Sequence, residues 1–257
     1  MIEVLNLSAF YGTKCIFKDI SFNLKSGSFT ALCGKNGAGK STLLNLMAGI
    51  VPAGLKFEGD VLIDGNSVFK MKRKNIARKI SFLIQNENPV WNMTVRQFVE
   101  TGLYSAESLP KNQSDQQINE ALDRTGILDF AEKKIFNISG GEFQKCRLAR
   151  CLVQKTPYMF FDEHSEGLDL PFQQEFLGQI KNLGKTVLFS IHDINTAAIY
   201  AENFIIIFDE KIICGGKQDI FSEEILSEAF SSKTKIYTHP VLNIPQVLFV
   251  EGNRINS

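Results

Sequence analysis

The sequence lacks an excess of charge of either sign, because 28 lysines and arginines balance 28 aspartates and glutamates. Without a global basic field, non-specific collection of nucleic acid is not expected. The cationic run at residues 70–79 is the strongest local candidate for a basic patch, and such a short run is more commonly a solvated helix face. We therefore expect no nucleic-acid partner.

Cysteine is scarce, and its spacing argues against two further kinds of protein. The 5 cysteines are an odd number and include no CxxC pair, so neither a disulfide framework nor a zinc site is indicated. No apolar run approaches the roughly 20 residues of a membrane span, and the first residues do not read as a signal peptide. We expect free thiols in a reducing cytosol, with any membrane attachment supplied by a partner.

What the sequence does contain is enough apolar residues, 44% of 257, for a globular domain with a sizeable core. Strand-like runs lead into a glycine-rich turn and then a helical pattern at residues 40–50, which is the first unit of an α/β fold. Nearly continuous apolar runs return later, as parallel strands buried on both faces require. The early runs are residues 2–7, 20–24 and 29–34, and the later ones are residues 158–161, 186–192 and 204–208.

Helical spacing dominates residues 86–156, which we expect to form an insert, with Ser114 as one helix N-cap. After residue 209 we expect a hairpin with Glu210 and Lys211 at its turn, and then a short helix near residues 222–230.

Residues 34–41, GKNGAGKS, match the pattern G-x-x-x-x-G-K-[ST]. Glycines let successive backbone N–H groups face one anion, and the following helix adds its positive end. Lys40 is then placed to reach the terminal phosphates, and Ser41 to ligate Mg²⁺. Because the match lies between an expected strand and an expected helix, it predicts a nucleoside triphosphate site.

Two adjacent acids, Asp162 and Glu163, follow the apolar run at residues 158–161. Burying acids is costly unless a cation or a reaction needs them. A P-loop enzyme needs a second strand that ends in an acid for the magnesium shell, which predicts that role for Asp162. Glu163 is placed to polarise the attacking water as general base. Small kinases and GTPases satisfy the same two motifs.

A further motif separates these alternatives. Ser139, Gly140 and Gly141 open an expected helix, which makes a second phosphate-seeking helix N-terminus in the same chain. One nucleotide cannot easily be held by two separate helix ends of one small domain. Two chains, each offering this turn to the nucleotide of the other, are the economical arrangement.

Six segments occur in the order, and with approximately the intervals, of six motifs of the ATP-binding-cassette (ABC) ATPases. Over about residues 1–230, the chain therefore resembles this family. In the order Walker A, Q-loop, signature, Walker B, D-loop and H-loop, the segments are GKNGAGKST, FLIQNENP, ISGGEFQ, FFDE, SEGLD and SIHD.

The resemblance implies an α/β fold with a P-loop NTPase (RecA-like) core and a mostly parallel sheet. The core is expected at about residues 1–85 and 157–230, with an antiparallel β subdomain at its N-terminus. A helical subdomain is expected at about residues 86–156, and a short C-terminal tail, residues 231–257, is expected to pack on the core.

The resemblance also assigns residue roles, with ATP and Mg²⁺ as the bound species. Tyr11 matches the aromatic residue that stacks on adenine, Gln85 the Q-loop glutamine near the membrane partner, and His192 the histidine that touches the γ-phosphate. The expected catalytic residues are Glu163, His192 and Gln85, and the expected magnesium ligands are Ser41, Gln85 and Asp162. The other expected nucleotide-binding residues are Tyr11, Gly34, Lys35, Asn36, Gly37, Ala38, Gly39, Lys40, Ser41 and Thr42 and, across a dimer seam, Ser139, Gly140, Gly141, Glu142 and Asp169.

The chain departs from the usual pattern of the family near the Walker B and signature motifs. SEGLD differs from the commonest wording before the D-loop, and EFQKC follows the signature where arginine is often present. His164 stands where proline usually follows the Walker B acids, and Ile138 precedes the signature serine where leucine is typical. These departures leave the subfamily and the turnover rate open, since His164 could add a titrating neighbour to Glu163.

Residues 92–104, 126–142 and 190–230 look most like the ATPases of bacterial importers for metal chelates, namely iron-siderophore, haem and cobalamin systems. That resemblance implies a homodimer on the cytoplasmic face of the membrane, two transmembrane permease subunits and, indirectly, an extracytoplasmic binding protein. An ATPase of another small-solute or metal-ion transporter, an exporter half, and a non-transport ABC ATPase stay open. Exporter cassettes are commonly fused to membrane helices, and non-transport members generally have two cassettes or a long coiled-coil insertion; neither feature is visible here.

Overall fold

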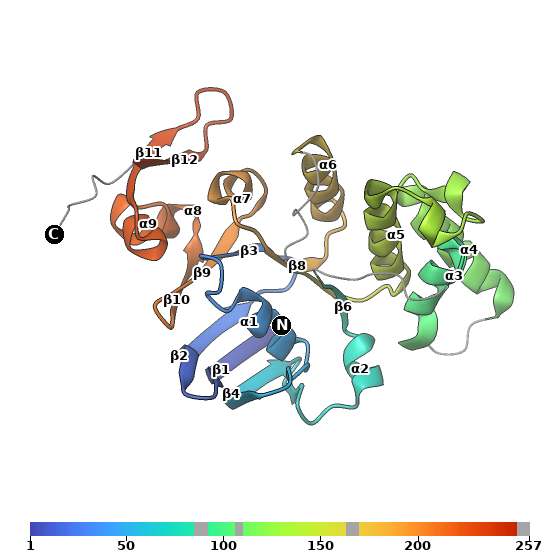
Figure 1. Cartoon of the computed structure of the whole chain (residues 1–257), viewed down its shortest axis with the longest axis horizontal. Helices are drawn as coiled ribbons and strands as arrows, with labels where there is room; N and C mark the ends of the chain where they lie inside the picture. Colours follow the sequence, from blue (N-terminus) through green and yellow to red (C-terminus); the bar gives the residue numbers. More distant parts are fainter. Residues whose placement is uncertain (85–91, 106–109, 163–169, 251–257) are drawn as a thin grey trace. The chain divides into compact units, whose positions relative to one another are not determined.

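A computed structural model describes residues 1–84, 92–105, 110–162 and 170–250, without the side chains of residues 170–173 (Figure 1). The chain falls into two compact units, one of Met1–Lys70 with Leu177–Ser257 and the other of Met71–Phe176. In the described ranges, none of the helices combines the length and the apolar character needed to cross a membrane.

The first unit begins with an antiparallel sheet in which β1 pairs with both β2 and β4. Along β2 the burial alternates, with Ile20, Phe22 and Leu24 buried and the residues between them exposed, so one face is packed and the other solvated. This sheet confirms the predicted antiparallel β subdomain. In spatial order its strands are β2 (Lys14–Leu24), β1 (Ile2–Tyr11), β4 (Leu55–Ile63) and β5 (Asn66–Ser67).

The same unit contains a mostly parallel sheet with β3 (Phe29–Cys33) at its centre. β8 (Thr186–Ser190) and β9 (Asn203–Phe208) pair parallel with β3 on its two sides. Every residue of β3 and β8 is buried, as expected of strands covered on both faces. β10 (Lys211–Gly216) adds an antiparallel edge to β9. The predicted α/β class with a mostly parallel sheet is confirmed.

Among the described residues, five helices belong wholly or partly to this unit, and α6 crosses its boundary with the second unit. The α1 helix follows β3, while α7 connects β8 to β9, so the connections alternate strand and helix as an α/β fold requires. Their bounds are α1 (Lys40–Met47), α6 (Leu170–Lys181), α7 (Ile194–Tyr200), α8 (Lys217–Ile220) and α9 (Glu223–Phe230).

The turn between β9 and β10 lies one residue earlier than predicted. Asp209 and Glu210 occupy it with φ values of 43° and 62°, which suits a two-residue hairpin turn of the primed type. Lys211 is already the first residue of β10, paired with Phe208.

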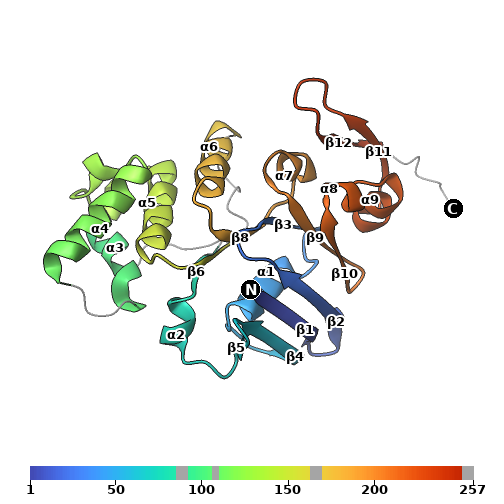
Figure 2. The same ribbon diagram turned by 180° about the vertical axis from the view of Figure 1, so that it is seen from behind.

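The C-terminal segment forms a second hairpin that no sequence pattern predicted. Strands β11 (Lys233–Thr238) and β12 (Pro245–Val250) pair antiparallel, and both views show them beside α9 (Figures 1 and 2). At the tip, the Nδ1 atom of His239 accepts hydrogen bonds from the N–H groups of Val241 and Leu242. This histidine therefore has a structural role at the tip of the hairpin.

The second unit pairs β6 (Ile80–Leu83) parallel with β7 (Tyr158–Phe161) and adds a helical body. Apolar side chains of α3, α4 and α5 share one buried cluster that includes Val99, Leu122 and Ala149. This confirms the helical character predicted for residues 86–156, while the exact domain boundary stays a prediction. The helices are α2 (Arg73–Ala77), α3 (Val95–Glu100), α4 (Lys111–Arg124) and α5 (Gly140–Val153), with short 3₁₀ turns η1 (Thr101–Ser105), η2 (Leu128–Phe130) and η3 (Ile135–Asn137).

The predicted N-cap at Ser114 is wrong. The α4 helix begins at Lys111 with Pro110 at its N-cap, and the N–H of Ser114 donates to the Pro110 carbonyl at 3.1 Å. Proline costs little at the start of a helix, where its missing N–H would have no acceptor inside the helix. The proline therefore sets the boundary one turn earlier than the serine.

Candidate functional site

The loop of residues 34–39 joins β3 to α1 and has a backbone that favours glycine. Gly34, Gly37 and Gly39 have φ values of 148°, 78° and 103°, which side-chain-bearing residues rarely adopt. The sequence therefore places glycine at three points where the loop must turn back on itself before the helix begins.

Two of these glycines are also required by close packing. A Cβ atom on Gly34 would lie 2.5 Å from the carbonyl oxygen of Ile207 in β9. A Cβ atom on Gly39 would lie 2.5 Å from Cγ2 of Ile16 in β2. The loop is thus packed between the two sheets of the first unit, and this packing fixes its course.

Lys40, the first residue of α1, is only 3% exposed. Its Nζ donates to the carbonyl oxygens of Gly34 at 2.9 Å and Lys35 at 3.1 Å. The ammonium group is therefore held inside the loop, and these carbonyl oxygens partly offset the cost of burying it.

The first turn of α1 adds to this positive character. N–H groups in the first turn of an α-helix have no acceptor within the helix, and Ser41 and Thr42 belong to this turn. No acidic side chain lies in the first turn of α1. The loop and helix start together form a cradle suited to phosphate.

Cys33, the last residue of β3, immediately precedes the P-loop and is buried near Lys40. Burial raises the pKa of its thiol to about 12; the nearby Lys40 ammonium lowers the pKa, and the carboxylate of Asp193 raises it. The thiol therefore stays protonated and acts as a small packing residue.

The structure brings His192 to the same edge of the sheet as the P-loop. β3 and β8 are parallel neighbours with Leu32 beside Ser190, and the N–H of Ile191 donates to the Leu32 carbonyl at 3.1 Å. The carboxyl ends of β3 and β8 therefore lie at the same edge of the sheet, which is where open α/β sheets bind ligands. Half-buried His192 follows directly after Ile191.

Tyr11 ends β1 beside Lys14 and Leu55, with 38% of its surface exposed. The β2 residues Ile16 and Phe17 line the space beside Gly39. Tyr11 is therefore at the end of the strand that pairs with β2, the strand that packs against the P-loop, and its side chain is partly exposed.

In the second unit, Asp162 directly follows β7 and is 4% exposed. Its N–H donates to the Leu83 carbonyl at 2.9 Å, which continues the parallel pairing of β6 and β7. Asp162 is therefore a buried acid at a strand end, as predicted. The predicted site residues Gln85, Glu163 and Asp169, together with His164, lie outside the described part of the chain.

Ser139 caps α5 through a reciprocal pair of hydrogen bonds. Its hydroxyl accepts from the N–H of Glu142 at 3.3 Å, and its own N–H donates to Oε2 of Glu142 at 2.6 Å. This is a capping box. The backbone and then the side-chain hydrogen bond of Ser139 hold the pKa of Glu142 below its usual value. This carboxylate therefore caps the start of its own helix, α5.

Gly140 and Gly141 differ from the glycines of the P-loop. Neither has a positive φ, and a Cβ atom on either would meet nothing within 4 Å. Nothing within the described chain therefore requires glycine in the first turn of α5.

Arg147 is a buried residue whose contacts the motifs did not reveal. It is 1% exposed, its Nη1 donates to Oε1 of Gln144 at 2.8 Å, and its Nη2 donates to the carbonyl of Ile84. Ile84 immediately precedes Gln85, so Arg147 links the signature helix to the start of the Q-loop segment. In the sequence, the signal for such a contact is an arginine at a core position of a helix, because buried arginines are almost always paired.

Comparison with known proteins places these features in a family. The family model described as ABC transporter matches residues 17–166. The petrobactin import ATP-binding protein FpuD of Bacillus anthracis is 31% identical over 95% of this chain and 91% of its own length. The iron(3+)-hydroxamate import ATP-binding protein FhuC of Bacillus subtilis is 32% identical over 93% of this chain and 90% of its own.

A solved structure supports the same assignment. The ATP-binding cassette MJ0796, in a dimeric state bound to ADP and phosphate, has a TM-score of 0.72 and 26% identity. The match covers 84% of this chain and 98% of that one. By its family match, its relatives and its P-loop, this chain belongs to the ABC transporter family and is one of its ATPases.

Proposed function

We propose that this chain is the ATP-hydrolysing subunit of a membrane importer for a metal chelate, in the class of iron-siderophore, haem and cobalamin systems. The observation that carries the ATPase function is the P-loop, with Lys40 inside it, at the same sheet edge as His192. The names of FpuD and FhuC, both import ATP-binding proteins, support the importer.

Binding of ATP would use the cradle as it is built. The phosphate oxygens replace the carbonyls of Gly34 and Lys35 as partners of the Lys40 ammonium, while N–H groups of the loop and of the first turn of α1 donate to them. Asn36, Ala38 and Thr42 take part through their positions in this loop and turn, and Tyr11 would stack on the adenine.

Hydrolysis would use the magnesium ligands, the general base and the histidine that the motifs predict. Ser41, Gln85 and Asp162 offer hydroxyl, amide and carboxylate oxygens, the hard donors that suit Mg²⁺. When bound, magnesium would neutralise negative charge on the phosphate oxygens. Glu163 would accept the proton of the attacking water, and His192 would contact the γ-phosphate.

The second chain would complete the site. The open space over Gly140 and Gly141 lets the triphosphate of a partner chain approach the main chain of α5 closely, next to the helix N-terminus and the Ser139 hydroxyl. Asp169 would lie at the seam between the two chains. The dimeric state of MJ0796 with ADP and phosphate supports this arrangement.

Transport would follow from nucleotide-dependent closure of the dimer. Two permease subunits would contact the ATPases near the Q-loop and the helical insert, which places this chain peripherally on the cytoplasmic face of the membrane. A separate binding protein would deliver the chelate from outside. The closed and the open ATPase dimer would each favour a different orientation of the permease. ATP binding and hydrolysis would therefore shift the population between the inward-facing and the outward-facing permease.

The importer is tested by purifying the complex of this chain from membranes under mild conditions and identifying its components by mass spectrometry. A polytopic permease together with a bound iron chelate, haem or cobalamin is expected. A permease with another solute or metal ion would change the substrate alone. Ribosomes or DNA in place of a permease would contradict the transport function and favour a non-transport ABC ATPase.

A further inference from the structure

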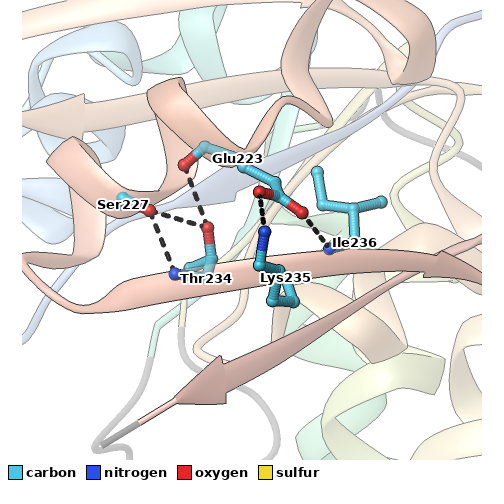
Figure 3. A network of polar contacts seen from close by, with 5 residues as sticks. All are labelled: Glu223, Ser227, Thr234, Lys235 and Ile236. Carbon is cyan, nitrogen blue, oxygen red and sulfur yellow. Dashed lines mark hydrogen bonds and ion pairs between the residues drawn. The ribbon is translucent and has the colours of Figure 1, made fainter. Parts of the chain in front are cut away.

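The C-terminal hairpin is tied to the helices beside it through both of its outer edges. On the β11 edge, the N–H of Thr234 donates to Oγ of Ser227 at 3.0 Å, and the N–H of Ile236 donates to Oε1 of Glu223 at 3.3 Å (Figure 3). Lys235 also pairs with Glu223 at 2.7 Å. Side chains of α9 thus supply the acceptors that a neighbouring strand would otherwise offer to this edge.

The β12 edge is bonded to a side chain of a different helix, α7. Oδ1 of Asn195, in the first turn of α7, accepts from the N–H of Val247 at 2.7 Å. Nδ2 of the same Asn195 donates to the Val247 carbonyl at 3.0 Å. The amide makes the two bonds that a paired residue of an antiparallel strand would make. It thereby fixes the start of α7 to the hairpin.

The start of α7 directly follows His192 in the chain. Before the histidine, Ile191 is bonded to Leu32 of β3. After it, Asp193 caps α7 by accepting from the N–H groups of Asn195 at 3.0 Å and Thr196 at 3.1 Å. His192 is therefore the single residue between the sheet and the cap of the helix.

The α7 helix is too short to set its own direction. It has 7 residues, and isolated helices shorter than about 12 residues are marginal in water. Its orientation must come from packing of its buried side chains and from the Asn195–Val247 pair. Loss of that pair would release the end of the helix that carries the Asp193 cap.

The C-terminal segment touches the P-loop as well. Nζ of Lys35 donates to Oγ of Ser231, the residue that ends α9 and precedes β11. The segment from α9 to β12 therefore contacts both parts of the site in the first unit, the phosphate cradle at Lys35 and the helix after His192.

We propose that Asn195 is a positioning residue for His192. Its amide, held by the main chain of Val247, fixes the start of α7 and with it the distance from His192 to the terminal phosphate in the P-loop. The inference rests on the proposed role of His192 at that phosphate. The proposal assigns Asn195 no contact with the nucleotide or with the attacking water.

The test replaces Asn195 by alanine in the whole chain and measures steady-state hydrolysis of magnesium-ATP. The kcat should fall about tenfold or more, because displacement of a positioned group by roughly 1 Å can cost about 10²-fold. The KM for ATP and the affinity for a non-hydrolysable analogue should stay unchanged, since Lys40 and its loop keep their contacts. Asn195→Leu keeps the number and branching of the side-chain heavy atoms without the hydrogen bonds, and gives a second reading if the alanine variant is unstable.

Ser227→Ala is the matched control. It removes side-chain hydrogen bonds from the opposite edge of the same hairpin but leaves the Asn195–Val247 pair. Its kcat should stay close to that of the parent chain. An equal loss in Ser227→Ala and Asn195→Ala would mean that the hairpin matters only for general stability, and the positioning role would be overturned.

A double variant shows whether Asn195 acts through the histidine. If it does, Asn195→Ala combined with His192→Ala should be no slower than His192→Ala alone, since effects of residues that act as a unit are not additive. Multiplied losses would overturn the inference. If Asn195→Ala turns over at the parent rate while His192→Ala is impaired, the positioning role of Asn195 is overturned but the role of His192 stands. Full turnover of His192→Ala would overturn the role of the histidine and the inference with it.

Discussion

Glycine serves two different purposes in this chain, and the distinction can be tested at single residues. At positions 34 and 39, packing within the chain requires glycine, because a Cβ atom on either residue would lie 2.5 Å from a neighbouring atom. Gly140 and Gly141 have open space around them. A requirement for glycine on α5 must therefore come from a molecule that approaches from outside, which is the argument for a partner's nucleotide.

Gly140→Ala should separate folding from activity. Alanine favours helix by up to about 1 kcal/mol over glycine, so the melting temperature should stay equal or rise. The added methyl group should keep the partner's triphosphate from the helix start, and ATP turnover should fall on the order of tenfold or more. Thermal unfolding and steady-state hydrolysis are measured on the same sample, and unchanged turnover would contradict the close approach.

Glu163→Gln tests the general base. Glutamine keeps the size of the side chain but cannot accept the proton, so hydrolysis should fall by about 10²–10⁴-fold. Nucleotide affinity, measured by calorimetry, should stay near that of the parent chain because Lys40 and its loop are intact. Turnover at the parent rate would exclude Glu163 from this role.

The signature helix α5 shows how an element start is fixed by local chemistry. The spacing of Ser139 and Glu142 is a capping-box pattern, and the helix starts where this pattern predicts. The pKa of Glu142 is lowered in the folded chain. Its stabilising effect is therefore fully present above the usual glutamate pKa and is lost as the pH falls through the lower value of the folded state.

Glu142→Gln should remove this pH dependence. Glutamine can still accept a hydrogen bond from the N–H of Ser139 but does not titrate, so the variant should lose less stability than the parent chain on acidification through the carboxyl range. Urea unfolding midpoints at neutral and acidic pH, compared between the two chains, measure the difference. Parallel midpoints at all pH values would show that the carboxylate charge does not contribute to the cap.

Sequence reasoning succeeded where the determining contacts are local. The P-loop, the strand before it and the start of α5 follow from patterns within about ten residues. It misplaced the start of α4, because Pro110 overrides Ser114. It missed the β11–β12 hairpin, because the edges of this hairpin are held by Asn195 and by side chains of α9 rather than by a pattern of its own.

The candidate site shows the same limit at residues far apart in sequence. The place of His192 beside the P-loop could be predicted, because parallel strands end at a common edge. The contact of Arg147 with Ile84 and the pairing of Asn195 with Val247 join residues 63 and 52 positions apart. No local pattern encodes such pairs, so only the folded chain reveals them.

At the scale of the whole molecule, the central expectation is that each ATP is shared between two chains. A mixing experiment tests it whichever substrate the importer carries. Lys40→Ala damages the phosphate cradle, and Ser139→Arg places a bulky side chain on the surface offered to the partner. Each variant alone carries the same defect at both sites of its dimer and should be nearly inactive.

A mixed dimer of Lys40→Ala and Ser139→Arg chains should regain activity. One of its two sites combines the intact P-loop of the Ser139→Arg chain with the intact signature of the Lys40→Ala chain, while the other site carries both defects. Phosphate release should therefore reappear on mixing and pass through a maximum near equal amounts. The control mixes each variant with a chain carrying both substitutions, which cannot form an intact site in any pairing. Equal and negligible rates in the mixture and the control, with mixed dimers verified by differential tags, would contradict sites built from two chains.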